Sequence, residues 1–305
     1  MSQRTFRAKN KRAVVLSFFG KVLRFVIIFG LAFIILKPFI VKILMAFMSP
    51  ADLNDSSVNM IPKHFSLHYW QEALSGMELA STAWNTVFLS VTVGIIQVFS
   101  STLVAYGLAR FKFKGNSLAF VMVIIMLLVP PQVTSVARYL GFKYMGVGPF
   151  TVDLIDTFFP LFISAFCCLG LKQGLYIYLL REFFRGMPQD LENSAYIDGA
   201  SPFTAFFRVI LPNAFTIMTT VFLFSFCWQW TDLSYPSLYL STKTVIPMKI
   251  MEMRGWLSTG LGENSVETTI LRNAAVMLFL IPLILLFVFC QKMMVKSIVR
   301  SGLAN

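Results

Sequence analysis

The sequence predicts an all-α, polytopic membrane protein with about six transmembrane helices and a helical loop on the cytoplasmic side. Of its 305 residues, 57% are hydrophobic and only 13% are charged, and the mean hydropathy is +0.72. Soluble domains carry about 25% charged residues, so this chain lacks the polar side chains to cover a surface in water. Six mostly apolar windows are each long enough to cross a hydrocarbon core; they cover approximately residues 25–47, 85–108, 117–136, 158–180, 213–233 and 271–291.

The first window follows a basic segment, residues 1–24. It starts too late and is too long for a cleaved signal peptide, so we expect a retained membrane anchor. If the N-terminus is cytoplasmic, most Lys and Arg residues fall in the cytoplasmic segments. Cytoplasmic loops of membrane proteins are usually richer in Lys and Arg, so the sequence predicts that both termini are cytoplasmic. The net charge of +12 therefore indicates contact with anionic lipid rather than nucleic acid. Lys37 and Lys42 lie within the first window, and we expect both to extend toward the outer headgroups.

Two long connections are predicted on the outer side, residues 48–84 and 234–270. Both mix aromatic residues, prolines and polar residues, a composition typical of interfacial helices or lid-like elements. All four cysteines lie in apolar stretches, so we interpret them as small hydrophobic residues and predict no metal or disulfide framework.

The loop between the fourth and fifth windows, residues 185–212, is the longest cytoplasmic insertion. Pro188 is placed to open a first short helix, and Gly199 is placed as its left-handed stop. Ser201 can cap a second helix that has Pro202 at its first position, and Pro212 is expected to break the helix before the next span. Two interpretations remain open from these residues alone. The loop is either an amphipathic segment on the membrane surface or a rigid knob that seats in a groove of a cytosolic partner.

This loop resembles the signature of permease subunits of ABC importers, roughly E-A-A-x-x-D-G-A followed by I-x-L-P. Residues 193–200 read NSAYIDGA and residues 209–212 read VILP. Asn193 therefore stands where the family has Glu, and Ser194 where it has Ala. Further segments that look like the family are 106–111, 129–133, 180–184 and 291–292. The chain is most similar to the shorter, six-span permease of maltose and multi-sugar importers.

The resemblance implies a transmembrane permease domain over residues 25–300 with a short tail at 301–305. Such a subunit forms half of a heterodimeric pore in the bacterial cytoplasmic membrane, beside a second permease subunit. A cytosolic ATPase dimer would grip the loop, and an extracytoplasmic solute-binding protein would deliver a carbohydrate, here expected to be an oligosaccharide. The sequence has no GxxxxGK[ST] motif, so we expect no enzymatic activity in this chain and no cofactor. The residues expected to couple to the ATPase are Glu192, Asn193, Ser194, Ala195, Asp198, Gly199, Ala200, Ser201, Pro202 and Pro212.

Polar residues inside the apolar windows are candidates for a substrate pathway. These are Lys172 and Gln173 in the fourth window and Gln229, Trp230 and Asp232 near the outer end of the fifth. An indole can stack on a sugar ring while a carboxylate accepts hydrogen bonds from hydroxyl groups. Two alternatives remain open: an interfacial aromatic belt for Trp228 and Trp230, and a buried ion pair for Lys172.

Two other classes of function would require different sequence features. An ion-coupled secondary transporter often shows internal symmetry and acidic residues deep in the membrane, and no window has an acidic residue at its middle. An integral-membrane enzyme usually needs a cluster of polar ligands. His64, His68 and Glu72 have helical spacing in the first outer connection, but we interpret them as structural and predict no metal site.

Overall fold

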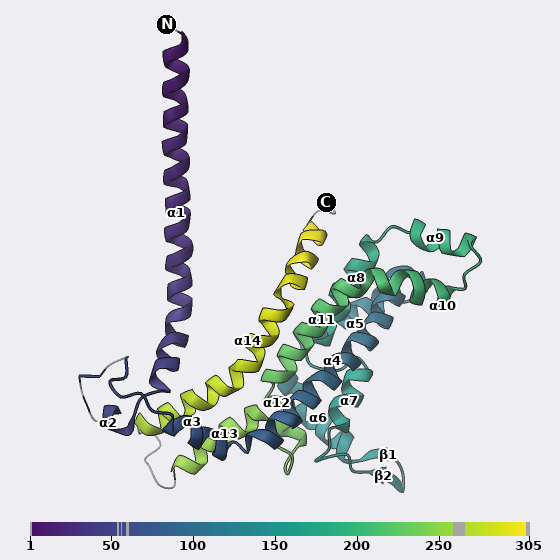
Figure 1. Cartoon of the computed structure of the whole chain (residues 1–305). Helices are drawn as coiled ribbons and strands as arrows, with labels where there is room; N and C mark the ends of the chain where they lie inside the picture. Colours follow the sequence, from purple (N-terminus) through teal and green to yellow (C-terminus); the bar gives the residue numbers. More distant parts are fainter. Residues whose placement is uncertain (1, 54, 56, 59–60, 259–265, 303–305) are drawn as a thin grey trace. The chain divides into compact units, whose positions relative to one another are not determined.

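The computed structural model describes residues 2–53, 55, 57–58, 61–258 and 266–302, so residues 303–305 of the predicted tail lie outside it. It confirms the predicted all-α class (Figure 1). A short antiparallel hairpin pairs β1 (Met145–Val147) with β2 (Phe150–Val152). The helices are α1 (Ser2–Met45), α2 (Pro50–Leu53), α3 (His68–Gly76), α4 (Leu79–Arg110), α5 (Asn116–Leu128), α6 (Pro131–Lys143), α7 (Phe159–Phe166), α8 (Gln173–Gly186), α9 (Asp190–Ile197), α10 (Pro202–Ala205), the π-helical turn η1 (Phe206–Ile210), α11 (Leu211–Thr231), α12 (Ser234–Tyr239), α13 (Ile246–Ser258) and α14 (Val266–Gly302).

The chain divides into two compact units. Unit 1 comprises Met1–Leu74 and Leu257–Met277, and unit 2 comprises Ser75–Trp256 and Leu278–Asn305. In unit 1, none of the most apolar window of α1 is buried, and large apolar side chains are exposed all along Leu16–Met45. A helix that is apolar on every side needs an apolar environment, so the surroundings of α1 are lipid or protein rather than water.

Four described helices are long and apolar enough to cross a membrane, namely Leu16–Met45, Leu79–Arg110, Pro202–Thr231 and Glu267–Gln291. The third predicted window is instead the bent pair α5 and α6, which turns by 103° and gives a fifth span if it is counted as one. Two adjacent prolines, Pro130 and Pro131, lie at the bend. Proline removes a helical hydrogen bond and forces the preceding residue into extended backbone, and Val129 and Pro130 are both extended.

The fourth predicted window is also interrupted. It comprises α7 and α8, separated by the non-helical residues 167–172. Cys168 and Lys172 both adopt left-handed backbone within this break, at φ 62° and 57°. Backbone groups that leave a helix in a membrane need other hydrogen-bond partners, so the break has to be supported by neighbouring side chains.

Unit 2 is centred on α4, which packs between α8 and α11. Small residues permit close packing between these helices, as is common in membranes. A Cβ added to Gly94 of α4 would lie 3.0 Å from the Phe222 ring of α11. A Cβ added to Gly174 of α8 would lie 2.9 Å from the carbonyl oxygen of Val123 in α5. A larger residue at position 174 would push against the backbone of α5, whereas one at position 94 would require the Phe222 ring to shift.

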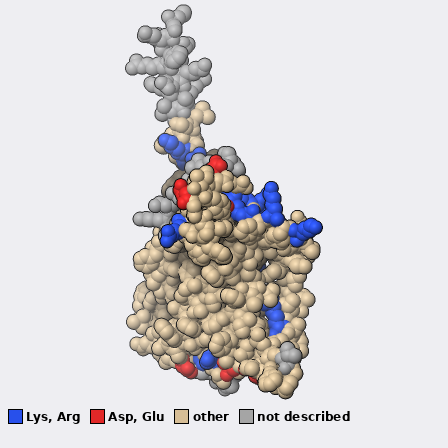
Figure 2. Space-filling model, turned by 90° about the vertical axis from the view of Figure 1, so that its right-hand side faces the viewer, with Lys and Arg blue, Asp and Glu red and all other residues tan. Residues whose placement is uncertain are grey.

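Unit 2 has two distinct ends. Figure 1 shows α9 and α10 at one end of the unit, and the β1–β2 hairpin and α12 at the other. In Figure 2 the visible face is largely uncharged between these ends, and most charged side chains gather near them. This distribution is that of a protein with an apolar belt and two polar surfaces.

Candidate functional site

The corner between α9 and α10 has the structure that its sequence predicts. Gly199 is left-handed at φ 81°, and its N–H donates to the Tyr196 carbonyl at 3.0 Å. The N–H of Ala200 donates to the Ala195 carbonyl at 2.9 Å. These two hydrogen bonds form a Schellman motif, which closes the end of a helix with a glycine. The expected left-handed stop at Gly199 is therefore confirmed.

The far side of the corner is capped as predicted. The Ser201 side-chain oxygen accepts a hydrogen bond from the Thr204 N–H at 3.3 Å, and Pro202 occupies the start of α10. The expected helix break at Pro212 is wrong, because the helical backbone continues from Pro202 to Thr231. A π-helical turn, η1, directly precedes α11, whose second residue is Pro212. A wider turn gives the proline ring more room beside the preceding turn of the helix.

Glu192 connects the corner to the end of α4. Its Oε1 lies 2.8 Å from Nε of Arg110, and the two side chains are only 11% and 6% exposed. Arg110 also donates from Nη2 to the Met187 carbonyl at 2.8 Å. Glu192 therefore points toward α4, away from the surface expected to meet an ATPase. The ion-pair role of Arg110 was missed, although Arg110 belongs to the family-like segment 106–111.

The remaining predicted coupling residues lie at or near the surface of the corner, with the exception of Ala195, which is buried. Asn193, Ser194 and Asp198 are exposed on α9 and at its end. Two large apolar side chains project from the same corner, because Ile197 is 86% exposed and Phe203 is 79% exposed. Apolar side chains exposed beside polar ones are typical of a surface that contacts another protein.

The break between α7 and α8 is held by two buried glutamines. Gln173 donates to the Ala165 carbonyl at 2.7 Å and to the Ser100 oxygen at 2.8 Å. Its own oxygen accepts the Gly170 N–H at 2.9 Å. Gln97 of α4 donates to the Leu171 carbonyl at 3.3 Å. Gln173, expected to line a substrate pathway, therefore satisfies backbone groups of the break in this structure.

Lys172 is exposed, so the alternative of a buried ion pair is wrong. Its Nζ lies 5.0 Å from the centroid of the Trp228 ring, a cation–π contact. Within the described chain, no carboxylate lies within 4.0 Å of it.

Trp230 belongs to the core of unit 2 and is completely buried. Its indole stacks on Phe226 at 5.5 Å and on Phe279 at 6.0 Å, and Nε1 donates to the Phe279 carbonyl at 3.2 Å. In this conformation both faces of the indole are covered. The ring is therefore not part of an exposed aromatic belt in this structure.

Gln229 lines a small, mostly apolar cavity near the C-terminal end of α11, and its amide nitrogen has no hydrogen-bond partner within the described structure. The cavity volume is about 10 Å³, room for about one water molecule. Other polar residues that line it, among them Gln97 and Arg138, were not predicted as pathway residues. Asp232 is buried nearby in the chain, and one of its oxygens accepts the Ser234 N–H at 2.9 Å.

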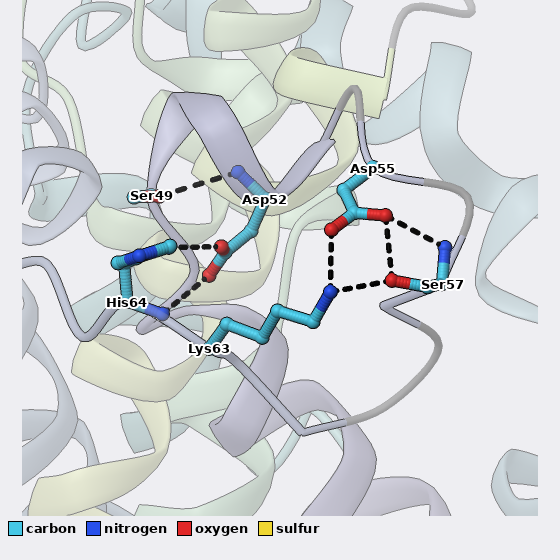
Figure 3. Close-up of polar contacts among 6 residues, drawn as sticks. All are labelled: Ser49, Asp52, Asp55, Ser57, Lys63 and His64. Carbon is cyan, nitrogen blue, oxygen red and sulfur yellow. Dashed lines mark hydrogen bonds and ion pairs between the residues drawn. The ribbon is translucent and has the colours of Figure 1, made fainter.

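The two histidines of residues 48–84 have structural contacts in unit 1. Asp52 accepts hydrogen bonds from the His64 backbone N–H at 3.0 Å and lies 2.9 Å from His64 Nδ1 (Figure 3). Beside this pair, Lys63 contacts Asp55 at 2.6 Å and also contacts Ser57. His68 lies 3.7 Å from Glu72. The described residues contain no group of three or more potential metal ligands, so His64, His68 and Glu72 do not form such a cluster.

Comparisons with known proteins agree with this architecture. The profile of a family described as "Binding-protein-dependent transport system inner membrane component" matches residues 97–300. The alpha-glucoside transport system permease protein AglG of Rhizobium meliloti (strain 1021) is 28% identical over 79% of this chain, and the match spans 61% of that relative. The polygalacturonan/rhamnogalacturonan transport system permease protein YtcP of Bacillus subtilis (strain 168) is 27% identical over 87% of this chain and 91% of its own length.

One solved structure has a similar fold. It is the crystal structure of a bacterial ABC transporter involved in the import of the acidic polysaccharide alginate. The match has a TM-score of 0.68 and 20% identity, and it covers 96% of this chain and 98% of the chain in that structure.

Proposed function

Because this chain belongs to the family of binding-protein-dependent transport system inner membrane components, we propose that it forms half of a carbohydrate translocation pore and couples it to a separate ATPase. The observation that carries the coupling proposal is the α9–α10 corner. A Schellman motif and a serine cap fix its backbone, while Ile197 and Phe203 remain exposed. A fixed corner with exposed apolar side chains suits a helix-in-groove contact.

The ion pair between Arg110 and Glu192 offers a route from the corner into the membrane. Arg110 is the last residue of α4, and α4 packs against both α8 and α11. A displacement of the corner would therefore act on the helix at the centre of unit 2. If the ATPase binds the corner differently in its two nucleotide states, that difference in binding free energy biases the pore between inward- and outward-open forms.

The proposed substrate is a carbohydrate, and within that class an oligosaccharide. Both relatives are named as carbohydrate permeases, and unit 2 contains buried polar side chains that could meet hydroxyl groups in another conformation. Of the predicted pathway residues, Gln229 is the best placed, because its buried amide nitrogen has no partner among the described residues and borders the small cavity. A second permease subunit and an extracytoplasmic binding protein complete the proposed importer, with both termini of this chain in the cytoplasm.

Co-purification from membranes in mild detergent tests the coupling proposal. We expect Ile197→Glu and Phe203→Glu to abolish association with the ATPase while the protein still inserts. The matched control is Phe150→Glu, because Phe150 is 83% exposed on the hairpin at the other end of unit 2. Normal ATPase association in both corner variants would contradict the proposal. An isolated chain that transports solute without any ATPase would instead favour the secondary-transporter alternative.

Asn193 provides a second test, because it is exposed on α9 where the family signature has Glu. If this position faces the ATPase, Asn193→Glu will change the rate of transport-coupled ATP hydrolysis. The control is Asn213→Glu, since Asn213 is exposed in α11 outside the corner. Equal rates in the two variants and the unaltered protein would exclude Asn193 from the contact.

A further inference from the structure

A groove in unit 1 brings three basic side chains together. Lys37 and Lys42 come from α1, and Arg272 comes from the first part of α14. The groove has a volume of about 520 Å³, within the range of roughly 300–1,000 Å³ that is typical of small-ligand sites. Its remaining described lining is Pro38, Val41, Met45, Thr269, Asn273 and Val276, and none of these described residues is acidic.

The three cations are not neutralised within the described part of the chain. No carboxylate there lies within 4.0 Å of Lys37, Lys42 or Arg272, because the ion pairs involve other residues. All three lie in the apolar helical segments Leu16–Met45 and Glu267–Gln291. Uncompensated charge in such segments is costly, and the charges also repel one another. An anion bound between them would offset both effects.

The surroundings of the groove indicate the source of that anion. Ile34, Leu36 and Ile40 on α1, close to the two lysines, are all strongly exposed. These side chains require an apolar environment, and the molecule that combines a phosphate with long apolar chains is a phospholipid. We propose that this groove binds an anionic phospholipid, with its phosphate among Lys37, Lys42 and Arg272.

The chemistry of the three side chains suits a phosphate diester. The guanidinium of Arg272 can donate two parallel hydrogen bonds to phosphate oxygens, while each lysine provides a compact positive charge. Val41 and Val276 supply apolar walls for the first part of the acyl chains. A zwitterionic lipid carries its own ammonium group, so an anionic headgroup such as phosphatidylglycerol gains more from three cations.

Native mass spectrometry of the full chain in its purified complex tests the proposal. The complex is reconstituted in nanodiscs of phosphatidylglycerol and phosphatidylcholine. It is then released from the nanodiscs in the mass spectrometer, and the lipids that stay bound to the protein are identified. We expect retained phosphatidylglycerol in the unaltered protein and roughly 100-fold weaker retention in Lys37→Gln/Lys42→Gln/Arg272→Gln, at about 1 kcal/mol for each basic residue. The matched control, Lys112→Gln/Lys114→Gln/Arg185→Gln, removes the same charge from exposed positions in unit 2 and should retain the lipid.

Three results would overturn the proposal. These are equal lipid retention in the groove and control variants, displacement of the lipid by millimolar inorganic phosphate, and absence of bound lipid because a partner subunit fills the groove. A photoactivatable phosphatidylglycerol gives a measurement on unaltered protein, in case the triple variant does not fold. We expect its cross-links on α1 around residues 37–45, and cross-links that avoid this segment would contradict the assignment.

Discussion

Glu192→Gln tests whether the buried ion pair fixes the loop corner to α4. Removing one partner of a buried ion pair costs about 3–5 kcal/mol, because the other charge is left uncompensated. The pair is 11% and 6% exposed, and Arg110 keeps its hydrogen bond to the Met187 carbonyl in the variant. Because of this residual exposure and the remaining hydrogen bond, we expect a loss near the lower end of that range, about 3 kcal/mol.

A double-mutant cycle gives the sharpest form of this experiment. Glu192→Leu and Arg110→Leu should each destabilise the protein strongly, whereas the double variant should recover most of the loss because no buried charge remains. Stability is measured by reversible denaturant unfolding in detergent, and transport-coupled ATP hydrolysis is measured in parallel. The exposed Glu182, which pairs with Arg181, is the control, and Glu182→Gln should cost less than about 1 kcal/mol.

Additive losses in this cycle, within about 0.5 kcal/mol, would refute the reasoning, because the two side chains would then not be coupled. The activity measurement separates two roles of the pair. If single variants fold and retain the ATPase but no longer couple hydrolysis to transport, the ion pair transmits the displacement of the corner. If coupling survives, the pair contributes only to stability.

Three further predictions concern other positions. Gly199→Ala should lower the free energy of unfolding by about 1–2 kcal/mol. The cause is backbone strain alone, because φ is 81° and an added Cβ would meet nothing within 4 Å. Thermal unfolding of the variant measures this loss. Gly174→Ala should cost about 1–3 kcal/mol, because its Cβ would lie 2.9 Å from the Val123 carbonyl oxygen; thermal unfolding that matches the unaltered protein would refute this. Thr242 and Ser241 donate hydrogen bonds to the Asp156 carboxylate and hold its pKa well below the ordinary value of 3.8. The ionised carboxylate therefore contributes its full stabilisation above about pH 3.8, and this stabilisation is lost only as the pH falls through the lowered pKa. Amide protection in the turn, corrected for intrinsic exchange, should therefore be unchanged between pH 8 and 5 and be lost in Asp156→Ala.

The corner was predictable because its signals are local. Gly199, Ser201 and Pro202 each have a strong positional preference at a helix end, and no distant contact is needed to interpret them. The bend at Pro130 and Pro131 was also present in the sequence. The mean hydropathy of the window does not reveal this bend, because the two prolines change the direction of the backbone but hardly change the mean hydropathy.

The other features depend on contacts between distant parts of the chain. The break between α7 and α8 is stable because Gln97 and Ser100 of α4 reach its backbone and the side chain of Gln173. The inward orientation of Glu192 depends on Arg110 in the same way. The residues of each contact are far apart in the sequence and do not recur at helical spacing. From the sequence alone they could therefore be recognised as polar positions, but not as partners of one another.

The glutamine-supported break also has a consequence for the order in which the chain enters the membrane. Helix α4 precedes the break in the sequence, so during synthesis Gln97 and Ser100 emerge first. The segment with unsatisfied backbone groups therefore reaches the bilayer after the side chains that accommodate it. A rearranged gene that encoded α7 and α8 before α4 would reverse this order. The backbone groups of the break would then enter the hydrocarbon before the side chains that bind them had been synthesised.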